Sequence, residues 1–146
     1  MDALYLIREF KIEDTDFMPR LCSQLGYPVD LEEIKKNIGS LIDKPDYMIY
    51  VAVKWDGKVV GCIQTHISKV FYSEAMIEIN GLVVDEEYRG QGIGERLVQQ
   101  VEAFAKEQGY SYVNLRANAV RRHAHRFYEK LGYVKIKEQI NYRKKV

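Results

Sequence analysis

Residues 83–94 constrain the fold of this chain most strongly, because three glycines separate a strand-like run from an amphipathic helix. Gly90, Gly92 and Gly94 alternate with other residues directly after Arg89. Glycine lets the backbone take a positive φ and approach a ligand closely. Backbone N–H groups at the start of a helix bind anions, helped by the positive end of the helix dipole. The pattern therefore predicts a strand, an anion-binding turn and a helix in direct succession.

The helix after this turn has one apolar face, formed by Ile93, Leu97, Val101, Phe104 and Ala105. The turn itself does not fit two other phosphate-binding motifs. A dinucleotide-binding turn needs a small residue where Glu95 stands, and a P-loop needs Lys followed by Ser or Thr after its last glycine. A strand-to-helix turn that needs its glycines only for geometry remains the alternative.

Strands and helices follow one another along the rest of the chain without a linker or repeat. Strand-like runs cover residues 4–10, 48–55, 58–68, 75–84 and 112–117, and one broken strand or two short ones follow from residue 134. Helices are expected near 15–25, 31–38, 93–108 and 124–131. This order predicts an α+β fold, in which about four helices pack on a mixed, mostly antiparallel sheet of six to seven strands.

Several local signals mark where these elements begin, end or bend. Asp14 or Thr15 can cap the first helix, and Asp30 with Glu33 forms a capping box for the second. Asp56-Gly57 predicts a tight hairpin between the second and third strands. Gly81, inside the fourth strand, indicates a bulge or a close backbone approach.

Composition excludes several classes of protein. A chain of 146 residues has the size of one domain, which we expect to cover residues 1–146. Its net charge of +1 gives no general attraction to nucleic acid or to an anionic membrane. No apolar run approaches the roughly 18 residues of a membrane span. Cys22 and Cys62 form neither a metal-binding nor a redox motif. We expect a cytoplasmic protein with no metal, no nucleic-acid partner and no membrane association.

Two separated segments resemble one known family. Arg89-Gly90-Gln91-Gly92-Ile93-Gly94 matches the Q/R-x-x-G-x-G/A signature of the GNAT superfamily of acyl-CoA N-acyltransferases. Residues 127–133 resemble the FYEKLGF segment on the family's last helix. The order of elements is similar over nearly the whole chain. The resemblance implies an N-acetyltransferase that moves the acetyl group of acetyl-CoA onto a primary amine of a small molecule, peptide or protein by direct attack.

The resemblance also implies where acetyl-CoA binds. In such enzymes the pyrophosphate rests on loop amides, and the pantetheine arm pairs with the preceding strand. One N–H of that strand can also stabilise the oxyanion that forms at the thioester carbonyl. Seven residues before Tyr128 the family commonly has a cofactor-contacting asparagine, where this chain has Arg121, so Asn118 is an alternative source of the contact. The candidate cofactor-binding residues are Leu82, Val83, Val84, Arg89, Gly90, Gln91, Gly92, Ile93, Gly94, Glu95, Asn118 and Arg121.

Glu78 and Tyr128 are the candidate catalytic residues. An alkylammonium group has a pKa of about 10.4, so a base must take its proton before it attacks. Glu78 stands eleven positions before Arg89, where several family members carry a basic glutamate, although a solvated strand face is the alternative. Asn80 is expected to share its strand face. Tyr128 matches the family tyrosine that protonates the departing CoA thiolate, and a packing ring is its alternative.

Three functions are weighed at this point. Besides the acetyltransferase, a CoA-binding sensor without turnover and a nucleic-acid-binding protein are considered. The low net charge argues against nucleic acid, and the presence of both Glu78 and Tyr128 favours the enzyme. A basic cluster at residues 121–126 is either a solvated face or a contact for CoA phosphates or an acidic substrate group. The candidate acceptor-lining residues are His66, Tyr27, Phe71 and Tyr72. A homodimer is compatible with the resemblance.

Overall fold

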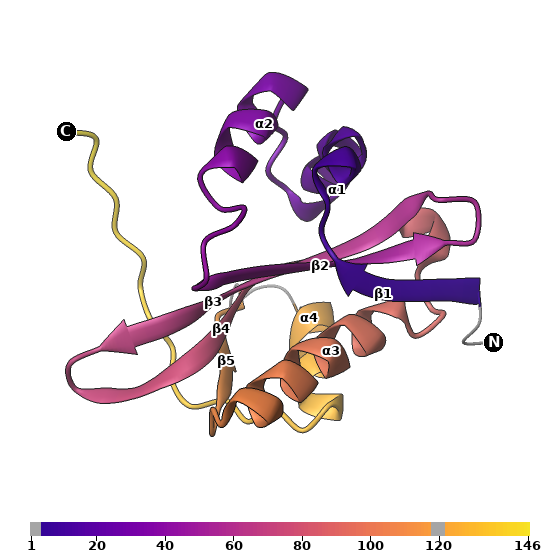
Figure 1. The fold of residues 1–146 in the computed structure, drawn as a ribbon. Helices are drawn as coiled ribbons and strands as arrows, with labels where there is room; N and C mark the ends of the chain where they lie inside the picture. Colours follow the sequence, from indigo (N-terminus) through magenta and orange to yellow (C-terminus); the bar gives the residue numbers. More distant parts are fainter. Residues whose placement is uncertain (1–3, 118–121) are drawn as a thin grey trace. The chain divides into compact units, whose positions relative to one another are not determined.

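The computed structural model describes residues 4–117 and 122–146. The chain divides into two compact units, Met1–Leu115 and Arg116–Val146. In the larger unit five strands form one sheet in the order β1-β2-β3-β4-β5 (Figure 1). The first four strands pair antiparallel and β5 runs parallel to β4, which confirms the predicted mixed sheet. The strands are β1 Tyr5–Glu9, β2 Tyr47–Lys54, β3 Val59–Val70, β4 Ser73–Val84 and β5 Val113–Leu115.

Three α-helices complete the larger unit, namely α1 Met18–Leu25, α2 Leu31–Gly39 and α3 Ile93–Gln108. The predicted cap of α2 is confirmed, since the Asp30 carboxylate accepts a hydrogen bond from the Glu33 N–H at 2.9 Å. The predicted cap of α1 is wrong. A 3-10 helix, η2 Ile12–Phe17, precedes α1, and the Asp14 carboxylate is already held by Arg8 at 2.8 Å. α1 therefore begins at Met18 and has Pro19 in its first turn.

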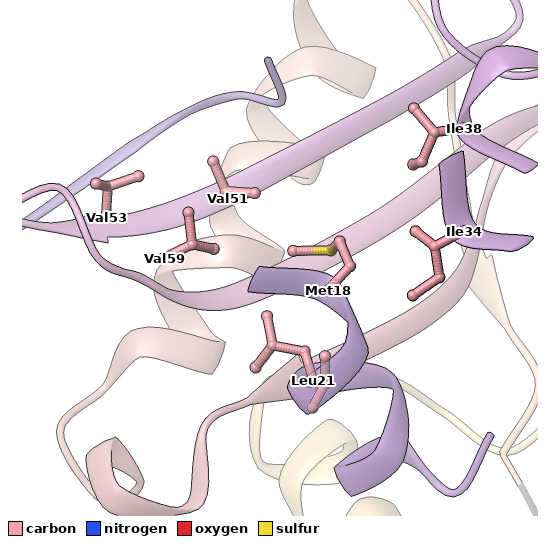
Figure 2. Close-up of a cluster of buried hydrophobic side chains, with 8 residues drawn as sticks. Met18, Leu21, Ile34, Ile38, Val51, Val53 and Val59 are labelled. Atoms are coloured by element: carbon pink, nitrogen blue, oxygen red, sulfur yellow. The ribbon is translucent and has the colours of Figure 1, made fainter. Parts of the chain in front are cut away.

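One face of the sheet packs against α1 and α2 (Figures 1 and 2). Met18 and Leu21 on α1 and Ile34 and Ile38 on α2 meet valines of the central strands, and all of these side chains are buried. The valines are Val51, Val53, Val59 and Val83. Cys22 and Cys62 are free thiols packed at the edge of this cluster. Burial raises the pKa of Cys62 to about 12, which fits the predicted structural role of this thiol.

The opposite face of the sheet packs against α3 (Figure 1). The predicted apolar face of this helix is buried, with Leu97, Val98 and Val101 fully inaccessible to solvent. A Cβ at Gly61 on β3 would lie 3.2 Å from side-chain atoms of both Ile93 and Leu97. Only glycine therefore lets α3 approach the sheet this closely. We call the turn between β4 and α3, which contains Gly90 and Gly92, the glycine loop. The first turn of α3, which follows this loop, is thereby held against the centre of the sheet.

Two β-bulges set which side chains share a face of the sheet. Between β2 and β3 the register shifts so that Val60 has no direct partner. Between β3 and β4, Thr65 pairs with Ile79 and Gln64 with Gly81, which leaves Asn80 as the extra residue. The bulge predicted at Gly81 is thus present immediately beside it. Because a bulge adds one residue to the period of two, Glu78 and Gly81 lie on the same face.

The smaller unit contains α4 Arg122–Lys130, which ends in a turn at Gly132 with φ of 96°. The predicted strands after residue 134 are wrong, because no strand is assigned anywhere in 133–146. Val134, Ile136, Ile140 and Tyr142 alternate in a strand-like way but remain about four-fifths exposed. A strand-like pattern becomes a strand only where a neighbour takes up its backbone hydrogen bonds. The sheet of the described residues accordingly has five strands rather than six or seven.

Candidate active site

The outer edge of β4 is only partly covered by β5. The two strands pair at Ile77–Val113, Glu78–Asn114 and Ile79–Leu115, and within the part of the chain that the structure describes no β5 partner is assigned further along β4. The N–H of Asp85 donates to Val60 on β3 at 2.8 Å. Because backbone groups alternate in direction along a strand, the N–H and C=O groups of Leu82 and Val84 point away from β3. Within the described residues this leaves both backbone groups of Leu82 and the N–H of Val84 without a strand partner, whereas the Val84 carbonyl oxygen accepts from Arg89. We call this part of β4 the open edge.

This open edge leads into the glycine loop. Gly90 and Gly92 have φ of 78° and 82°, a backbone conformation that side chains rarely allow, and a Cβ at either position would meet nothing within 4 Å. Gly92 is the N-cap of α3, so the N–H groups of the first turn have no acceptor inside the helix. A shallow cavity of about 300 Å³ lies here, lined by Gln91, Gly92, Glu95, Arg96 and Gln99. The loop has both the space and the donors for an anion.

Arg89 supports the loop through a hydrogen bond to the backbone at the end of β4. Its Nε donates to the carbonyl oxygen of Val84 at 2.9 Å, across the turn that joins β4 to α3. Through this contact Arg89 braces the turn, and its predicted contact with the cofactor stays a prediction. The three predicted positions that follow, Gly90, Gln91 and Gly92, are exposed to solvent, whereas Ile93 is buried under the sheet.

Elements from the start of the chain hold both ends of this loop. Asp85, which is 1% exposed, accepts two hydrogen bonds from the Arg20 guanidinium at 2.7 and 3.1 Å. The Arg20 hydrogen bond lowers the pKa of Asp85 to about 2. Next to it, the N–H of Glu86 donates to the Gln24 side chain. At the other end, the Tyr5 hydroxyl donates to Gln91. These contacts hold the loop in one conformation before any ligand binds.

Glu78 lies on the same strand, four to six residues before the open edge. Its side chain is on the face that carries α1 and α2, and it is 7% exposed. The Asn114 amide donates to its Oε2 at 2.9 Å. His66 lies directly opposite on β3, and its Nδ1 is 2.9 Å from Oδ1 of Asn80. Asn80 thus reaches the face where the sequence places it, although it is the bulged residue.

Tyr128 belongs to the smaller unit, where its ring makes edge-to-face contacts with two neighbours. The ring centroids of Phe127 and Tyr133 lie 5.0 and 5.7 Å from that of Tyr128. Burial raises the pKa of Tyr128 to about 12. The phenol therefore keeps its proton over the whole physiological range and is a hydrogen-bond donor.

Other predicted positions are placed less favourably or lie outside the described residues. Asn118 and Arg121 are outside them, so their predicted cofactor contacts stay predictions. Phe71 and Tyr72 form the exposed turn between β3 and β4, about 20 Å along β4 from Glu78 at roughly 3.3 Å per residue. Tyr27 is exposed directly after α1. Phe71 and Tyr72 therefore do not lie around Glu78, and the acceptor-lining role of Tyr27 stays a prediction.

Some residues of the site carry no recognisable signal in the sequence. Arg20 and Tyr5 support the glycine loop from 65 and 86 positions away. Asn114 stands in a strand of three residues, and its pairing with Glu78 depends on the register of that strand. Among the described residues, no cluster of three or more His, Cys, Asp or Glu side chains could hold a metal ion. No helix in the same residues has the length and apolar character to cross a membrane.

Comparison with known proteins decides the family. The profile of the acetyltransferase (GNAT) family matches residues 10–133. The chain belongs to this family. It is 33% identical over 129 residues to the aminoalkylphosphonate N-acetyltransferase of Salmonella typhimurium, a match that covers 87% of this chain and 83% of that protein.

Solved structures agree with this assignment. The fold is similar to a GNAT acetyltransferase of Staphylococcus aureus, with a TM-score of 0.81, 21% identity and coverage of 96% of this chain and 98% of the other. It is also similar to an aminoglycoside N-acetyltransferase in complex with CoA, with a TM-score of 0.85, 17% identity and coverage of 97% and 95%. The resemblance read from the sequence is confirmed, and the chain is an N-acetyltransferase of the GNAT type with an α+β fold.

Proposed function

We propose that this acetyltransferase moves the acetyl group of acetyl-CoA onto a small primary amine by direct attack. The observation that carries the proposal is the continuous path along β4. It begins at the buried carboxylate of Glu78, follows the open edge at Leu82 and Val84, and ends at the glycine loop and the first turn of α3. Under this proposal Glu78 is the base, the open edge takes the thioester arm and the glycine loop takes the diphosphate, which is the order that the reaction needs.

The described residues fit acetyl-CoA, whose activated thioester supplies the acetyl group. Leu82 and Val84 would hold the pantetheine arm through backbone hydrogen bonds, as an added strand does, while Val83 between them pairs with β3. The amides from Gln91 to Glu95 would hold the diphosphate, helped by the dipole of α3. Gly90 and Gly92 leave the space for it, since a Cβ there would meet no protein atom. A backbone N–H at the open edge would also stabilise negative charge on the thioester oxygen.

Glu78 would take the proton of the ammonium group before attack. Its carboxylate is shielded from bulk solvent and held by Asn114, so its orientation is fixed. A positioned base of this kind contributes about 10²–10⁴-fold to a rate. Tyr128 would donate a proton to the departing thiolate, for which its protonated phenol is suited. Asn118 and Arg121 remain candidate cofactor contacts under this proposal.

We also propose that residues 1–146 act as one acetyltransferase domain, although they divide into two compact units. The family match at 10–133, which spans both units, supports this. The Salmonella relative carries the name of an enzyme acting on aminoalkylphosphonates, and this supports a small amine as the acceptor here. Nothing in the comparisons supports a sensor without turnover. A homodimer and a cytoplasmic location stay predictions from the sequence.

Turnover with a panel of amines tests the proposal. Release of free CoA thiol is followed with a thiol reagent, for wild type and for Glu78→Gln, on alkylamines, diamines, amino sugars, amino acids and aminoalkylphosphonates. Thiol release that depends on the amine and falls in the variant is expected. Thiol release at the same rate with and without amine would show hydrolysis instead of transfer and would contradict the proposal.

A further inference from the structure

Four side chains form a row across the larger unit, one from each of β2, β3, β4 and β5. Tyr47 pairs with His66, His66 pairs with Glu78, and Glu78 pairs with Asn114. Directly paired residues on neighbouring strands project to the same face of a sheet. We call these four residues the acceptor row. The acceptor row lies on the face that carries α1 and α2. Among the described residues, each of β2, β3 and β5 contributes a single residue to the row through Glu78.

The acceptor row changes character from one end to the other. At β5 and β4 it is polar, with a half-buried Asn114 whose amide donates to the buried Glu78 at 2.9 Å. At β3 the partly exposed His66 ring is fixed by Asn80, which is 2.9 Å from its Nδ1. At β2 the ring of Tyr47 is 41% exposed and lies 5.9 Å from the His66 ring, tilted by 31°. A ligand that reaches Glu78 along this face passes the imidazole and the phenol.

The bond to Asn80 determines what the imidazole offers to such a ligand. An amide oxygen only accepts hydrogen bonds, so Nδ1 of His66 carries the hydrogen and donates it. In the neutral ring, Nε2 is then an acceptor. Side chains on directly paired residues start about 5 Å apart at Cβ. The acceptor row therefore presents two hydrogen-bond acceptors, the Glu78 carboxylate and Nε2 of His66, on side chains whose Cβ atoms are about this far apart.

The charge of the row restricts the ligand further. Its four residues bring one carboxylate and no lysine or arginine. Lys69, on the same strand as His66, is paired with Asp46 at 3.4 Å. The oxygens of a deprotonated anionic substituent on the acceptor have no hydrogen to donate to Nε2 of His66.

We infer that the acceptor row selects a primary amine with a second hydrogen-bond donor two or three carbons away, as in a diamine or an amino sugar. His66 is the specificity-determining residue, and Asn80 is a positioning residue that sets which imidazole nitrogen accepts. The inference rests on the proposed function, in which Glu78 receives the proton of the attacking amine. It differs from the named activity of the Salmonella relative, whose substrates carry a phosphonate.

Kinetics on matched acceptors test the inference. Wild type, His66→Phe and His66→Gln are compared on propylamine, 1,3-diaminopropane and 2-aminoethylphosphonate. Wild type is expected to prefer the diamine over both others. His66→Phe should lower kcat/KM for the diamine by about 5–10-fold more than kcat/KM for propylamine, the value of one hydrogen bond. His66→Gln, which keeps an acceptor oxygen, should recover part of the loss. Equal effects on diamine and propylamine, or a preference for the phosphonate, overturn the inference.

Two substitutions of Asn80 test its positioning role. Asn80→Asp keeps an acceptor for Nδ1–H and should retain the preference for the diamine, whereas Asn80→Leu releases the ring and should reduce it. Retention of the full preference in Asn80→Leu would overturn the positioning role.

A binding measurement separates this inference from the proposed function. NMR signals of the His66 ring are followed in the CoA-loaded protein while each amine is added. Shifts with the diamine but not with propylamine support the acceptor row even if wild type acetylates no amine, an outcome that would sink the proposed function alone. Unmoved His66 signals at saturating diamine overturn the acceptor row whatever the turnover.

Discussion

At the scale of single residues, the sequence identifies Glu78 as a candidate base but does not identify the side chains that surround it. Glu78 was selected by its spacing from Arg89, and the structure shows a shielded carboxylate held by Asn114. The neighbours that define the site, Asn114 and His66, are set by strand register, which two bulges shift. Gly61 directly follows the bulged Val60, but a glycine in a strand marks either a bulge or a close backbone approach and does not fix the register. Residues opposite Glu78 therefore could not be named before the structure.

Exchange of the proposed base should slow acetyl transfer without disturbing the fold. Glu78→Gln keeps the shape and the bond from Asn114, so kcat/KM at neutral pH should fall by about 10²–10⁴-fold. The loss should shrink as the pH rises and neutral amine becomes plentiful. Glu74→Gln, an exposed change on the same strand, is the matched control and should leave the rate unchanged. A pH–rate profile of Glu78→Gln that overlies that of wild type would assign the proton transfer to water or another residue.

The role of Tyr128 can be separated from ring packing by deleting one hydroxyl. In Tyr128→Phe the contacts with Phe127 and Tyr133 survive, so the melting temperature and acetyl-CoA affinity should stay near wild type. A proton donor lost from the transition state lowers kcat and kcat/KM together. Since the pKa of Tyr128 is about 12, any fall in wild-type rate below about pH 11 must come from another group. Tyr133→Phe is the control, and a weaker acetyl-CoA affinity with unchanged kcat in Tyr128→Phe would make Tyr128 a cofactor contact.

At the scale of elements, the unit β4–loop–α3 was predictable because its signals are local. The apolar period of residues 93–105, the glycines and the strand-like run each specify their own conformation. The strands expected after residue 134 failed because a strand depends on a partner that its own sequence does not supply. The start of α1 failed for a related reason, since Arg8 engages Asp14 and removes it as a cap.

The glycine loop is tested by two substitutions with the same backbone cost. Gly92 and Gly57 have φ of 82° and 90°, and both have open space where a Cβ would stand. Gly92→Asp and Gly57→Asp should therefore lose similar stability, about 1 kcal/mol each. Only Gly92→Asp puts a negative charge at the start of α3, so only this variant should lose acetyl-CoA binding, measured by calorimetry. Equal acetyl-CoA affinity of the two variants would contradict the assigned cradle.

The ion pair between Arg20 on α1 and Asp85 at the end of β4 should make part of the protein's stability sensitive to acid. The pKa of Asp85 is lowered to about 2 by Arg20, so the ion pair stabilises the fold at neutral pH. This stabilisation is lost as the pH falls from about 4 to 2. Asp85→Asn should thus be less stable than wild type at pH 7, by at most about 2 kcal/mol because Arg20 is half exposed, and the gap should narrow on acidification.

The control for the Arg20–Asp85 ion pair is Glu87→Gln, because Glu87 is exposed and its carboxylate lies 3.7 Å from the same guanidinium. Its unfolding free energy, measured in urea, should follow that of wild type at every pH. A gap between Asp85→Asn and wild type that stays constant from pH 7 to pH 2 would show that the ion pair is not its source.

At the scale of the whole molecule, the family match spans both compact units, and the ligand should therefore stabilise the chain as one cooperative body. Acetyl-CoA at 100 times its Kd adds about 2.7 kcal/mol to the unfolding free energy by mass action. For a chain of this size that corresponds to a rise in Tm of roughly 5–10 °C. ATP and NAD offer phosphates to the loop but no pantetheine arm for the open edge of β4, so they should raise Tm much less. Differential scanning calorimetry should show one transition that moves with acetyl-CoA. Two transitions of which only one moves would show that the units melt separately, and equal shifts with ATP would remove the open edge from the binding site.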